Sequence, residues 1–255
     1  MEGEGLIVAK NLTKKFGEFL AVDHLNLAVR KGEIYGFLGP NGAGKTTTIK
    51  MLTGVLKPTE GSVEILGMDL RTHELEIKRR IGVVPEEPRL YPHLTGQEFL
   101  EFIIDLYDLD RHEATKRVVE LCEAFKVDFL GKRIGEFSHG MKQKLILVSV
   151  FMRKPEVIFL DEPTVGLDAK SAKILKLLLR KYASEGTTIF MTTHILEIAE
   201  KMCDRIGIIN NGRLIAEGTM DELRTLAKDE RATLEDLFLQ LTAEGEDIEE
   251  IIKEL

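Results

Sequence analysis

A glycine-rich loop between an apolar run and a helical segment most constrains the fold of this chain. The loop Gly39–Thr46 matches the pattern G-x-x-x-x-G-K-[ST], follows the apolar run Ile34–Leu38 and precedes the helix-like segment Thr46–Leu52. A strand, a glycine loop and a helix in this order bring backbone N–H groups and a helix N-terminus onto phosphate oxygens. We expect Lys45 at the β- and γ-phosphates and the Thr46 hydroxyl at Mg²⁺. The residues that we predict to bind nucleotide are Gly39, Pro40, Asn41, Gly42, Ala43, Gly44, Lys45, Thr46 and Thr47.

Two later apolar runs end in polar residues suited to phosphate chemistry. Val157–Leu160 is followed by Asp161 and Glu162, and the run Thr188–Thr193 is followed by His194. Ligands bind at the carboxyl ends of strands in a parallel sheet. Asp161 fits the carboxylate on the metal side, and Glu162 could polarise the attacking water. We expect His194 to bond the γ-phosphate and, with Lys45 and Glu162, to form the catalytic set.

The remaining periodicity is that of strands alternating with helices. Alternation at residues 25–29 favours a half-buried strand in an opening β-rich part that covers residues 6–9 and 18–29. Short apolar runs at 81–84, 205–209 and 212–216 add further strands, whereas residues 86–152 carry only helix-like patterns. This order predicts an α/β fold with a mostly parallel sheet and an inserted helical part.

Helical segments are expected within that insertion and in the tail. Residues 95–107 and 111–125 are amphipathic, and Thr95 with Glu98 forms a capping-box pattern at the start of the first segment. The chain is expected to be helical again from Met220 onward. We predict a body of residues 1–220, with the helical insertion at about 87–152, and an acidic helical tail of residues 221–255.

A short polar stretch lies between the insertion and the acid pair. Phe137–Gln143 reads FSHGMKQ, and its Ser138 stands 23 residues before Asp161. A serine can cap a helix, and the helix that follows would present its positive end to an anion.

Together these residues resemble the ATP-binding subunit of an ABC transporter, over about residues 6–217. The resemblance implies a P-loop NTPase fold with an N-terminal antiparallel β subdomain and an inserted helical subdomain. Gly39–Thr46 resembles the Walker A loop, Val157–Glu162 the Walker B strand, and Gly166–Asp168 the D-loop of the dimer interface. His194 resembles the switch histidine, and Phe16 the aromatic residue that stacks on adenine, although a core phenylalanine is the alternative.

The same resemblance implies a two-chain mechanism. Two subunits, identical or homologous, sandwich two ATP molecules with Mg²⁺, and each site joins one chain's loops to the signature of the other. The signature residues implied to contact the partner chain's ATP are Ser138, His139, Gly140 and Met141. Closure on ATP and opening after hydrolysis would move a separate integral-membrane permease.

Two residues depart from the family pattern. Glu86 stands where glutamine is usual; its oxygens could still bind the metal together with Thr46 and Asp161, but it offers no N–H donor. His139 replaces a glycine of the signature, where it could crowd the partner's phosphate or donate to it. The sequence leaves both alternatives open.

Local features resemble ATPases that serve exporters. They are Met141, the loop that contains Glu86, and the segment Thr233–Phe238. Leu90 and Tyr91 are candidates for the permease contact, with ordinary loop packing as the alternative. The N-terminus lacks an apolar signal region and no apolar run approaches the roughly 18 residues of a membrane span. We therefore expect a cytoplasmic protein, peripheral on the inner face of the cell membrane.

Charge and cysteine content limit other functions. Residues 243–255 carry six acids and one lysine, so of the net charge of −8 only −3 belongs to the rest of the chain. This balance disfavours a nucleic-acid partner, and Cys122 and Cys203 are expected to be small buried side chains. Two alternatives remain: a soluble ABC ATPase that acts on nucleic acid or ribosomes, for which no second cassette is seen, and a non-hydrolysing regulatory module.

Overall fold

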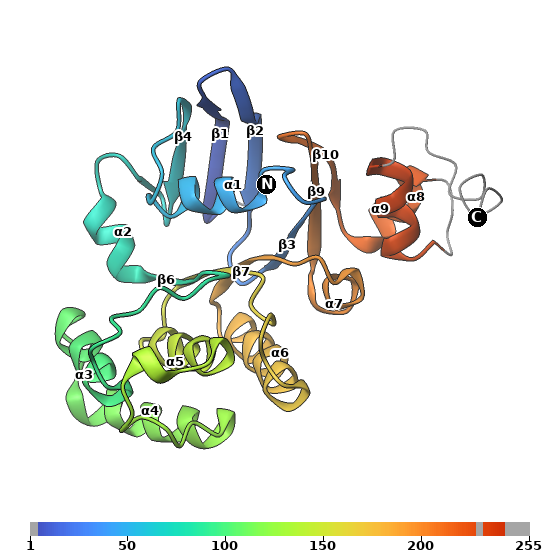
Figure 1. Cartoon of the computed structure of the whole chain (residues 1–255). Coiled ribbons are helices and arrows are strands. Elements are labelled where there is room, and N and C mark those ends of the chain that lie inside the picture. Colours follow the sequence, from blue (N-terminus) through green and yellow to red (C-terminus); the bar gives the residue numbers. More distant parts are fainter. Residues whose placement is uncertain (1–4, 228–231, 243–255) are drawn as a thin grey trace.

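A six-stranded sheet forms the centre of the computed structural model, which describes residues 5–227 and 232–242 (Figure 1). Its strands lie in the order β10-β9-β3-β8-β7-β6. Five of them are parallel, and only the edge strand β10 is antiparallel to its neighbour. The mostly parallel sheet predicted from the sequence is confirmed. The strands are β3 (Ile34–Leu38), β6 (Ile81–Val84), β7 (Val157–Asp161), β8 (Thr188–Thr192), β9 (Arg205–Asn210) and β10 (Arg213–Gly218).

A second, antiparallel sheet is built from the N-terminal part of the chain, in the order β2-β1-β4-β5. Its first strand extends to Phe16, well beyond the predicted residues 6–9. The strand is longer because β2 and β4 pair with it on both sides and form hydrogen bonds with its backbone, which do not depend on its side chains. The hydropathy pattern also predicts no strand at residues 60–69. The strands are β1 (Ile7–Phe16), β2 (Phe19–Val29), β4 (Glu60–Ile65) and β5 (Met68–Asp69).

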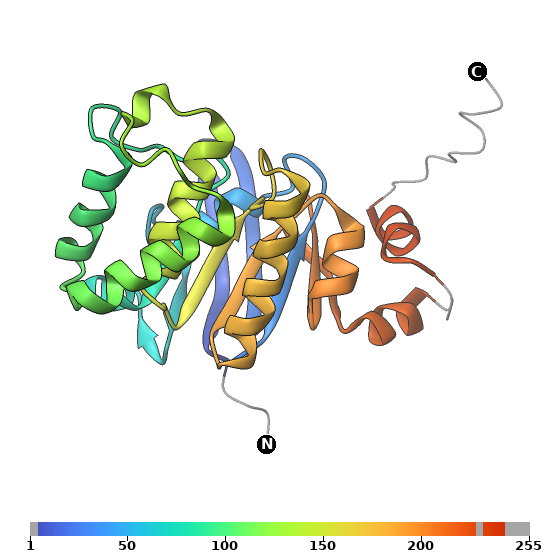
Figure 2. The same cartoon turned by 90° about the horizontal axis from the view of Figure 1, so that it is seen from below.

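Both faces of the inner strands β3, β7 and β8 are covered, and every residue of these strands is buried. Successive side chains of a strand point to opposite faces. Val157 and Phe159 join a core with the antiparallel sheet and helix α1 (Lys45–Leu52), whereas Ile158 and Leu160 join a core with the helices on the other side. Figure 2 shows these helices lying across the sheet. A half-buried strand would alternate in polarity, so the continuous runs indicate burial on both sides.

The predicted helical insertion forms the lower layer in Figure 1. The segment at 111–125 is helical as predicted, and the one at 95–107 forms a helix whose N-cap is Thr95. Thr95 Oγ1 accepts from the Glu98 N–H at 3.1 Å, and Glu98 Oε2 accepts from the Thr95 N–H at 2.7 Å, so the capping box is present. The helices of the chain beyond α1 are α2 (Glu74–Arg80), α3 (Gly96–Leu106), α4 (Arg111–Phe125), α5 (His139–Phe151), α6 (Ala169–Ser184), α7 (Leu196–Met202), α8 (Met220–Ala227) and α9 (Leu234–Thr242).

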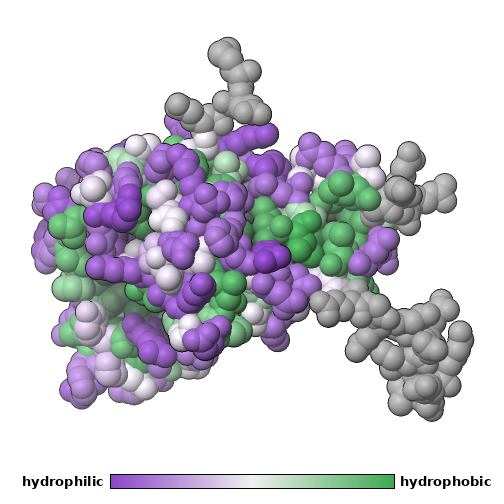
Figure 3. Space-filling model, turned by 90° about the horizontal axis from the view of Figure 1, so that it is seen from above, coloured by the Kyte–Doolittle hydropathy of each residue, from purple (hydrophilic) through white to green (hydrophobic). Residues whose placement is uncertain are grey.

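The last two helices pack against α7 and β9. Leu223, Leu234 and Leu237 are fully buried in this third core, and the Arg224 guanidinium pairs with Glu200 at 3.1 Å. In Figure 3 apolar surface gathers toward the end of the molecule that carries α8 and α9. The acidic stretch 243–255 lies outside the described residues, and the boundaries proposed for the insertion and the tail remain predictions. None of the helices described in residues 5–227 and 232–242 is both long and apolar enough to cross a membrane.

The two cysteines pack beside the helical core. Both were expected to be buried, and both are half-buried against this core. Burial raises the pKa of the Cys122 thiol to about 11 and that of the Cys203 thiol to about 12. They therefore stay protonated near neutral pH and behave as small apolar side chains.

Replacing Thr95 with alanine tests whether the capping box stabilises α3. Thr95→Ala is expected to lower the free energy of unfolding by about 1 kcal/mol, because the first turn loses its side-chain acceptor. Urea denaturation followed by circular dichroism measures this change. Gln97→Ala, an exposed neighbour in the same turn, should change stability by less than about 0.5 kcal/mol. Equal losses in the two variants would contradict the role of the cap.

Candidate active site

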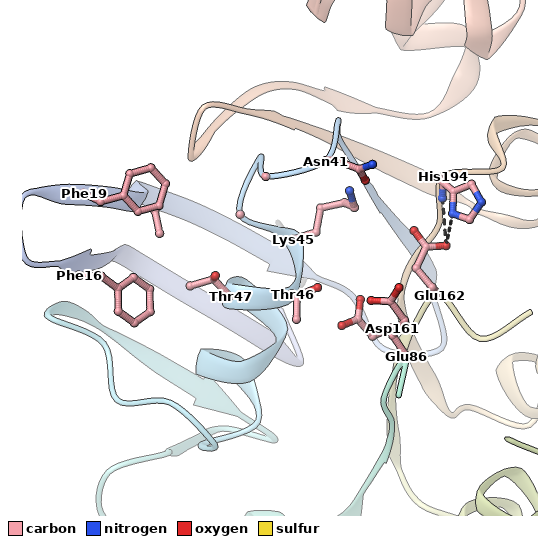
Figure 4. Close-up of a pocket in the computed structure, with 13 residues that line it drawn as sticks. Phe16, Phe19, Asn41, Lys45, Thr46, Thr47, Glu86, Asp161, Glu162 and His194 are labelled. Atoms are coloured by element: carbon pink, nitrogen blue, oxygen red, sulfur yellow. Dashed lines mark hydrogen bonds and ion pairs between the residues drawn. The ribbon is translucent and has the colours of Figure 1, made fainter. Parts of the chain in front are cut away.

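A cavity of about 550 Å³ opens at the carboxyl ends of β3 and β7 and beside the end of β8. In Figure 4 two aromatic rings stand at one end, the acids and His194 at the other, and Lys45 and Thr46 between them. The residues that line it are Phe16, Phe19, Ala21, Asn41, Gly42, Gly44, Lys45, Thr46, Thr47, Glu86, Asp161, Glu162 and His194.

The glycine loop leaves the start of α1 open. Gly44 is the N-cap residue and adopts φ 107°, and a Cβ built there would lie 2.6 Å from the Ala21 carbonyl oxygen. Only glycine fits this position. Because Gly44 has no side chain with which to cap α1, the first N–H groups of the helix remain available to an anion in the cavity.

Lys45 is the cation at the centre of the cavity. It is largely buried, and its Nζ donates to the carbonyl oxygens of Gly39 at 2.7 Å and Pro40 at 3.1 Å. Burial lowers the pKa of the ammonium group, while the nearby carboxylates of Glu162 and Asp161, and more weakly that of Glu86, act in the opposite direction. A negatively charged ligand would relieve the cost of burying this cation.

Asp161 and Glu162 are both buried although they are consecutive residues at a strand end. In a regular strand their side chains would point to opposite faces. Glu162 instead adopts φ 47°, a left-handed conformation that costs roughly 1–2 kcal/mol for a residue with a Cβ. The turn lets both carboxylates line the same cavity.

The neighbouring strand holds this turn. The Thr192 hydroxyl donates to Asp161 Oδ1 at 2.6 Å and accepts from the Glu162 N–H at 3.1 Å. Beyond it, Glu162 Oε2 accepts from the His194 backbone N–H at 3.2 Å and lies 2.8 Å from His194 Nδ1. The acids and the histidine therefore form one hydrogen-bonded group.

The aromatic end of the cavity is formed by the hairpin between β1 and β2. Phe16 is 50% exposed and Phe19 62% exposed, so neither is a core residue. The alternative of a core phenylalanine at position 16 is therefore wrong. Lys14 Nζ lies 5.2 Å from the centroid of the Phe16 ring. Exposed rings beside a cationic loop suit the stacking of a planar base.

The stretch Ser138–Met141 lies outside this cavity. Ser138 caps α5, with its Oγ accepting from the Met141 N–H at 3.3 Å. A Cβ built at Gly166, whose φ is +78°, would overlap the His139 ring, so that ring lies against the loop after Glu162 in its own chain. His139 also lines a second cavity of about 390 Å³ with Glu86 and Lys142.

Further contacts tie α5 to this loop. The buried Gln143 donates from Nε2 to the Pro163 carbonyl oxygen at 3.3 Å, and Lys144 Nζ pairs with Asp168 Oδ2 at 2.8 Å. Asp168 also caps α6 by accepting from the Ser171 N–H and hydroxyl. The bond from Lys144, followed by those from Ser171, holds the pKa of Asp168 well below its usual value.

The structure thus brings Phe16, most of the glycine loop, Glu86, Asp161, Glu162 and His194 into one cavity. The other predicted residues do not line this cavity. Gly39 and Pro40 accept from Lys45 Nζ through their carbonyl oxygens, and Ala43 is buried. Asp168 and residues 138–141 lie outside the cavity. The sequence patterns missed Phe19 and Thr192. No local signal points to Thr192, because its role depends on the pairing of β7 with β8.

The chain is similar to a family of known proteins. The family model described as "ABC transporter" matches residues 22–165. The chain is 42% identical over 243 residues to the probable multidrug ABC transporter ATP-binding protein YbhF of Escherichia coli (strain K12), a match that covers 94% of this chain. It spans only 42% of that relative's length. It is also 42% identical over 220 residues to the bacitracin transport ATP-binding protein BcrA of Bacillus licheniformis, covering 86% of this chain and 71% of the relative.

Solved structures resemble this fold along nearly the whole chain. An ATP-binding subunit of an ABC transporter superposes with a TM-score of 0.90 at 33% identity, covering 93% of this chain and all of the other. The dimeric ATP-binding cassette MJ0796, in a post-hydrolysis state bound to ADP and Pi, gives a TM-score of 0.76 at 29% identity and covers 84% of this chain and 98% of the other.

The lowered pKa of Asp168 predicts a pH-dependent contribution to stability. A depressed pKa stabilises the fold above the unfolded value of 3.8, and this contribution is lost as the pH falls through the lower folded value. Asp168→Asn keeps a capping oxygen but loses the charge. Urea denaturation at pH 7 should show a loss of less than about 1 kcal/mol, because the carboxylate is exposed and screened.

The difference between wild type and Asp168→Asn should shrink as the pH falls below 3.8. In a Lys144→Met background the same substitution should cost less at pH 7, because the paired ammonium group is gone. A difference that stays constant from pH 7 to below 3.8, or that Lys144→Met leaves unchanged, would exclude the ion pair as its cause.

Proposed function

The chain belongs to the ABC transporter family, and from this membership we propose that it is the ATP-binding and ATP-hydrolysing subunit of a transporter with a separate membrane permease. One observation carries the proposal: Lys45, Thr46, Asp161, Glu162 and His194 line a single cavity, with Glu162 bonded to His194. A phosphate-binding lysine, oxygen ligands for a cation and an oriented general base are the set that phosphoryl transfer to water requires.

The cavity has room and chemistry for a nucleotide along its length. The adenine stacks on Phe16 beside Phe19, and the phosphates lie over the start of α1. Lys45 already donates to two carbonyl oxygens, so it is held within reach of the phosphate oxygens. The buried cation and the helix N-terminus then neutralise the phosphates without reorganisation.

The residues present also fit Mg²⁺. Thr46, Asp161 and Glu86 line the cavity and offer only oxygen atoms, which hard cations prefer. Within residues 5–227 and 232–242 no group of three or more His, Cys, Asp or Glu could hold a metal by itself. That is compatible with a cation that takes much of its coordination from phosphates and water. When bound, Mg²⁺ would neutralise charge that develops on the phosphates.

Glu162 is the general base of the proposed reaction. Its Oε2 accepts from His194, whereas no hydrogen bond among the described residues engages Oε1. Oε1 can therefore take a proton from a water molecule whose oxygen attacks the γ-phosphorus. The new O–P bond forms as the bond to the bridging oxygen breaks, which leaves ADP and phosphate. His194 keeps the carboxylate oriented, and its exposed ring can contact the γ-phosphate.

A second chain completes the site. The capped start of α5 does not line the cavity of its own chain, which supports a contact of Ser138–Met141 with the nucleotide of a partner. The solved structure of the MJ0796 cassette is a dimer, which supports this arrangement. The partner is a second copy or a homologous ATPase subunit, and Asp168 belongs to the segment that would meet it.

The permease contact is proposed for the face of the helical layer beside the Glu86 loop. Tyr91 is 59% exposed and packs edge-on against Phe102, whose ring centroid lies 6.0 Å away. Leu106 is exposed on the same helix, whereas Leu90 packs against the core. Tyr91 is therefore the better candidate. Docking there would place the chain on the inner face of the cell membrane.

Export is the direction that the relatives support. Besides the multidrug and bacitracin proteins named above, the chain is similar to the Nod factor export ATP-binding protein I of Burkholderia orbicola (strain AU 1054). The two are 40% identical over 210 residues. A regulatory role without hydrolysis would draw support from Glu86, which adds a third carboxylate to the cavity. Turnover measurements separate the two.

Glu162→Gln tests the proposed chemistry. Steady-state ATP hydrolysis by the purified chain should fall by about 100-fold or more, because the amide cannot accept the proton. ATP binding should remain, and size-exclusion chromatography with ATP and Mg²⁺ should show a trapped dimer. Phosphate release measures the turnover.

Lys45→Ala is the matched control, since it should lose nucleotide binding as well as turnover. Undiminished hydrolysis in Glu162→Gln would exclude Glu162 as the base. Wild-type binding of ATP without turnover, even with the permease that co-purifies from native membranes, would favour the regulatory role. Stimulation by nucleic acid would favour the soluble ATPase.

His139→Gly tests the unusual residue of the signature. Because the His139 ring packs on Gly166 of its own chain, its removal opens space and takes no group from the cavity that holds Lys45. ATPase activity should therefore stay at the wild-type level or rise. Total loss of turnover in a folded His139→Gly protein would mean that the imidazole is required.

A further inference from the structure

Among the described residues, Thr192 is the one whose side chain hydrogen-bonds to both acids of the site. It is the last residue of β8, fully buried, and stands opposite Asp161 in the register of β7 and β8. Its hydroxyl lies 2.6 Å from Asp161 Oδ1 and 3.1 Å from the Glu162 nitrogen.

The direction of both bonds follows from the chemistry of the partners. An ionised carboxylate only accepts, and a backbone N–H only donates. The hydroxyl must therefore give its single proton to Asp161 and accept from Glu162. A methyl group of the same size could make neither bond.

Each bond fixes a different part of the site. Because Asp161 Oδ1 is taken by Thr192, the carboxylate cannot rotate freely and keeps its second oxygen for a cation. The bond to the Glu162 N–H fixes the peptide at which φ becomes positive, so that the Glu162 side chain turns back into the cavity. His194, two residues beyond Thr192, then holds the carboxylate itself.

We propose that Thr192 is a positioning residue that couples the metal-side carboxylate of Asp161 to the placement of the general base Glu162. The proposal rests on the function proposed above. Thr192 is fully buried and does not line the cavity, so it acts only through the two acids. Its loss should therefore affect turnover and metal binding together, and leave metal-free nucleotide binding intact.

The test compares three variants of the full chain. Thr192→Val removes the hydroxyl at constant volume, and Thr192→Ser restores it. Thr188→Val is the matched control, because Thr188 is equally buried at the other end of β8. Its hydroxyl also makes two bonds, from the Gly32 N–H at 2.9 Å and to the Arg30 carbonyl oxygen at 3.3 Å, both far from the cavity.

Two readouts are measured on each variant. Turnover of ATP is followed with the KM for ATP, and Mn²⁺ binding in the presence of a non-hydrolysable ATP analogue is followed by electron paramagnetic resonance. Outer contacts of a metal-bound carboxylate commonly change metal affinity or activity by about 10- to 100-fold. Thr192→Val should therefore lose about tenfold or more in kcat and in Mn²⁺ affinity, with little change in KM. Thr192→Ser should restore both.

Thr188→Val should lose stability in urea as Thr192→Val does, yet keep kcat and Mn²⁺ affinity. Wild-type values of both in Thr192→Val, or equal losses in Thr188→Val, would overturn the proposal. If Thr192→Val does not fold, Thr192→Cys replaces it, because a thiol is a weak donor and a weak acceptor. Thr192→Cys should lose part of kcat and part of the Mn²⁺ affinity. Wild-type values of both in Thr192→Cys would overturn the proposal equally. If the wild-type chain together with its co-purifying permease binds the analogue without hydrolysing ATP, the proposed function fails, and the Mn²⁺ measurement still decides the role of Thr192.

Discussion

The parallel pairing of β3, β8 and β7 is the constraint on which the rest of the site depends. The register sets Phe37 beside Thr192 and Thr192 beside Asp161, so the glycine loop, the acids and His194 all leave the sheet at one level. Both faces of these strands are buried, which holds that register against slippage. Segments more than 100 residues apart in sequence thereby form one cavity.

Negative charge exceeds positive charge among the side chains of that cavity. The buried ammonium group of Lys45 faces three carboxylates. The carboxylate of Asp161 accepts from the Thr192 hydroxyl, and that of Glu162 accepts from the His194 backbone N–H. The third carboxylate, that of Glu86, lies toward solvent. A nucleotide adds further negative charge, so binding requires both the helix N-terminus and a cation. This explains why a protein with a net charge of −8 can accept a polyanion at one point of its surface.

The sequence predicted much of the fold, and its errors have physical causes. The strands of the central sheet and the helices at 95–107 and 111–125 were predicted because their signals are local: apolar runs, glycine loops, amphipathic patterns and the cap at Thr95. The length of β1 and the strands at 60–69 were missed because they depend on pairing partners distant in the chain. In the site, motif spacing identified Lys45, Asp161 and Glu162, whereas the role of Thr192 depends on a register that no local pattern reveals.

The contacts between α5 and the loop after Glu162 have a consequence for how two such chains work together. Three residues of this loop contact α5. Gln143 donates to the Pro163 carbonyl oxygen, the His139 ring packs on Gly166, and Lys144 forms an ion pair with Asp168. The surface proposed to contact a neighbour's nucleotide and the proposed base Glu162, at the start of the same loop, are therefore connected through these contacts. A displacement of α5 would be passed to this loop, so the two nucleotides of the proposed pair would be mechanically linked.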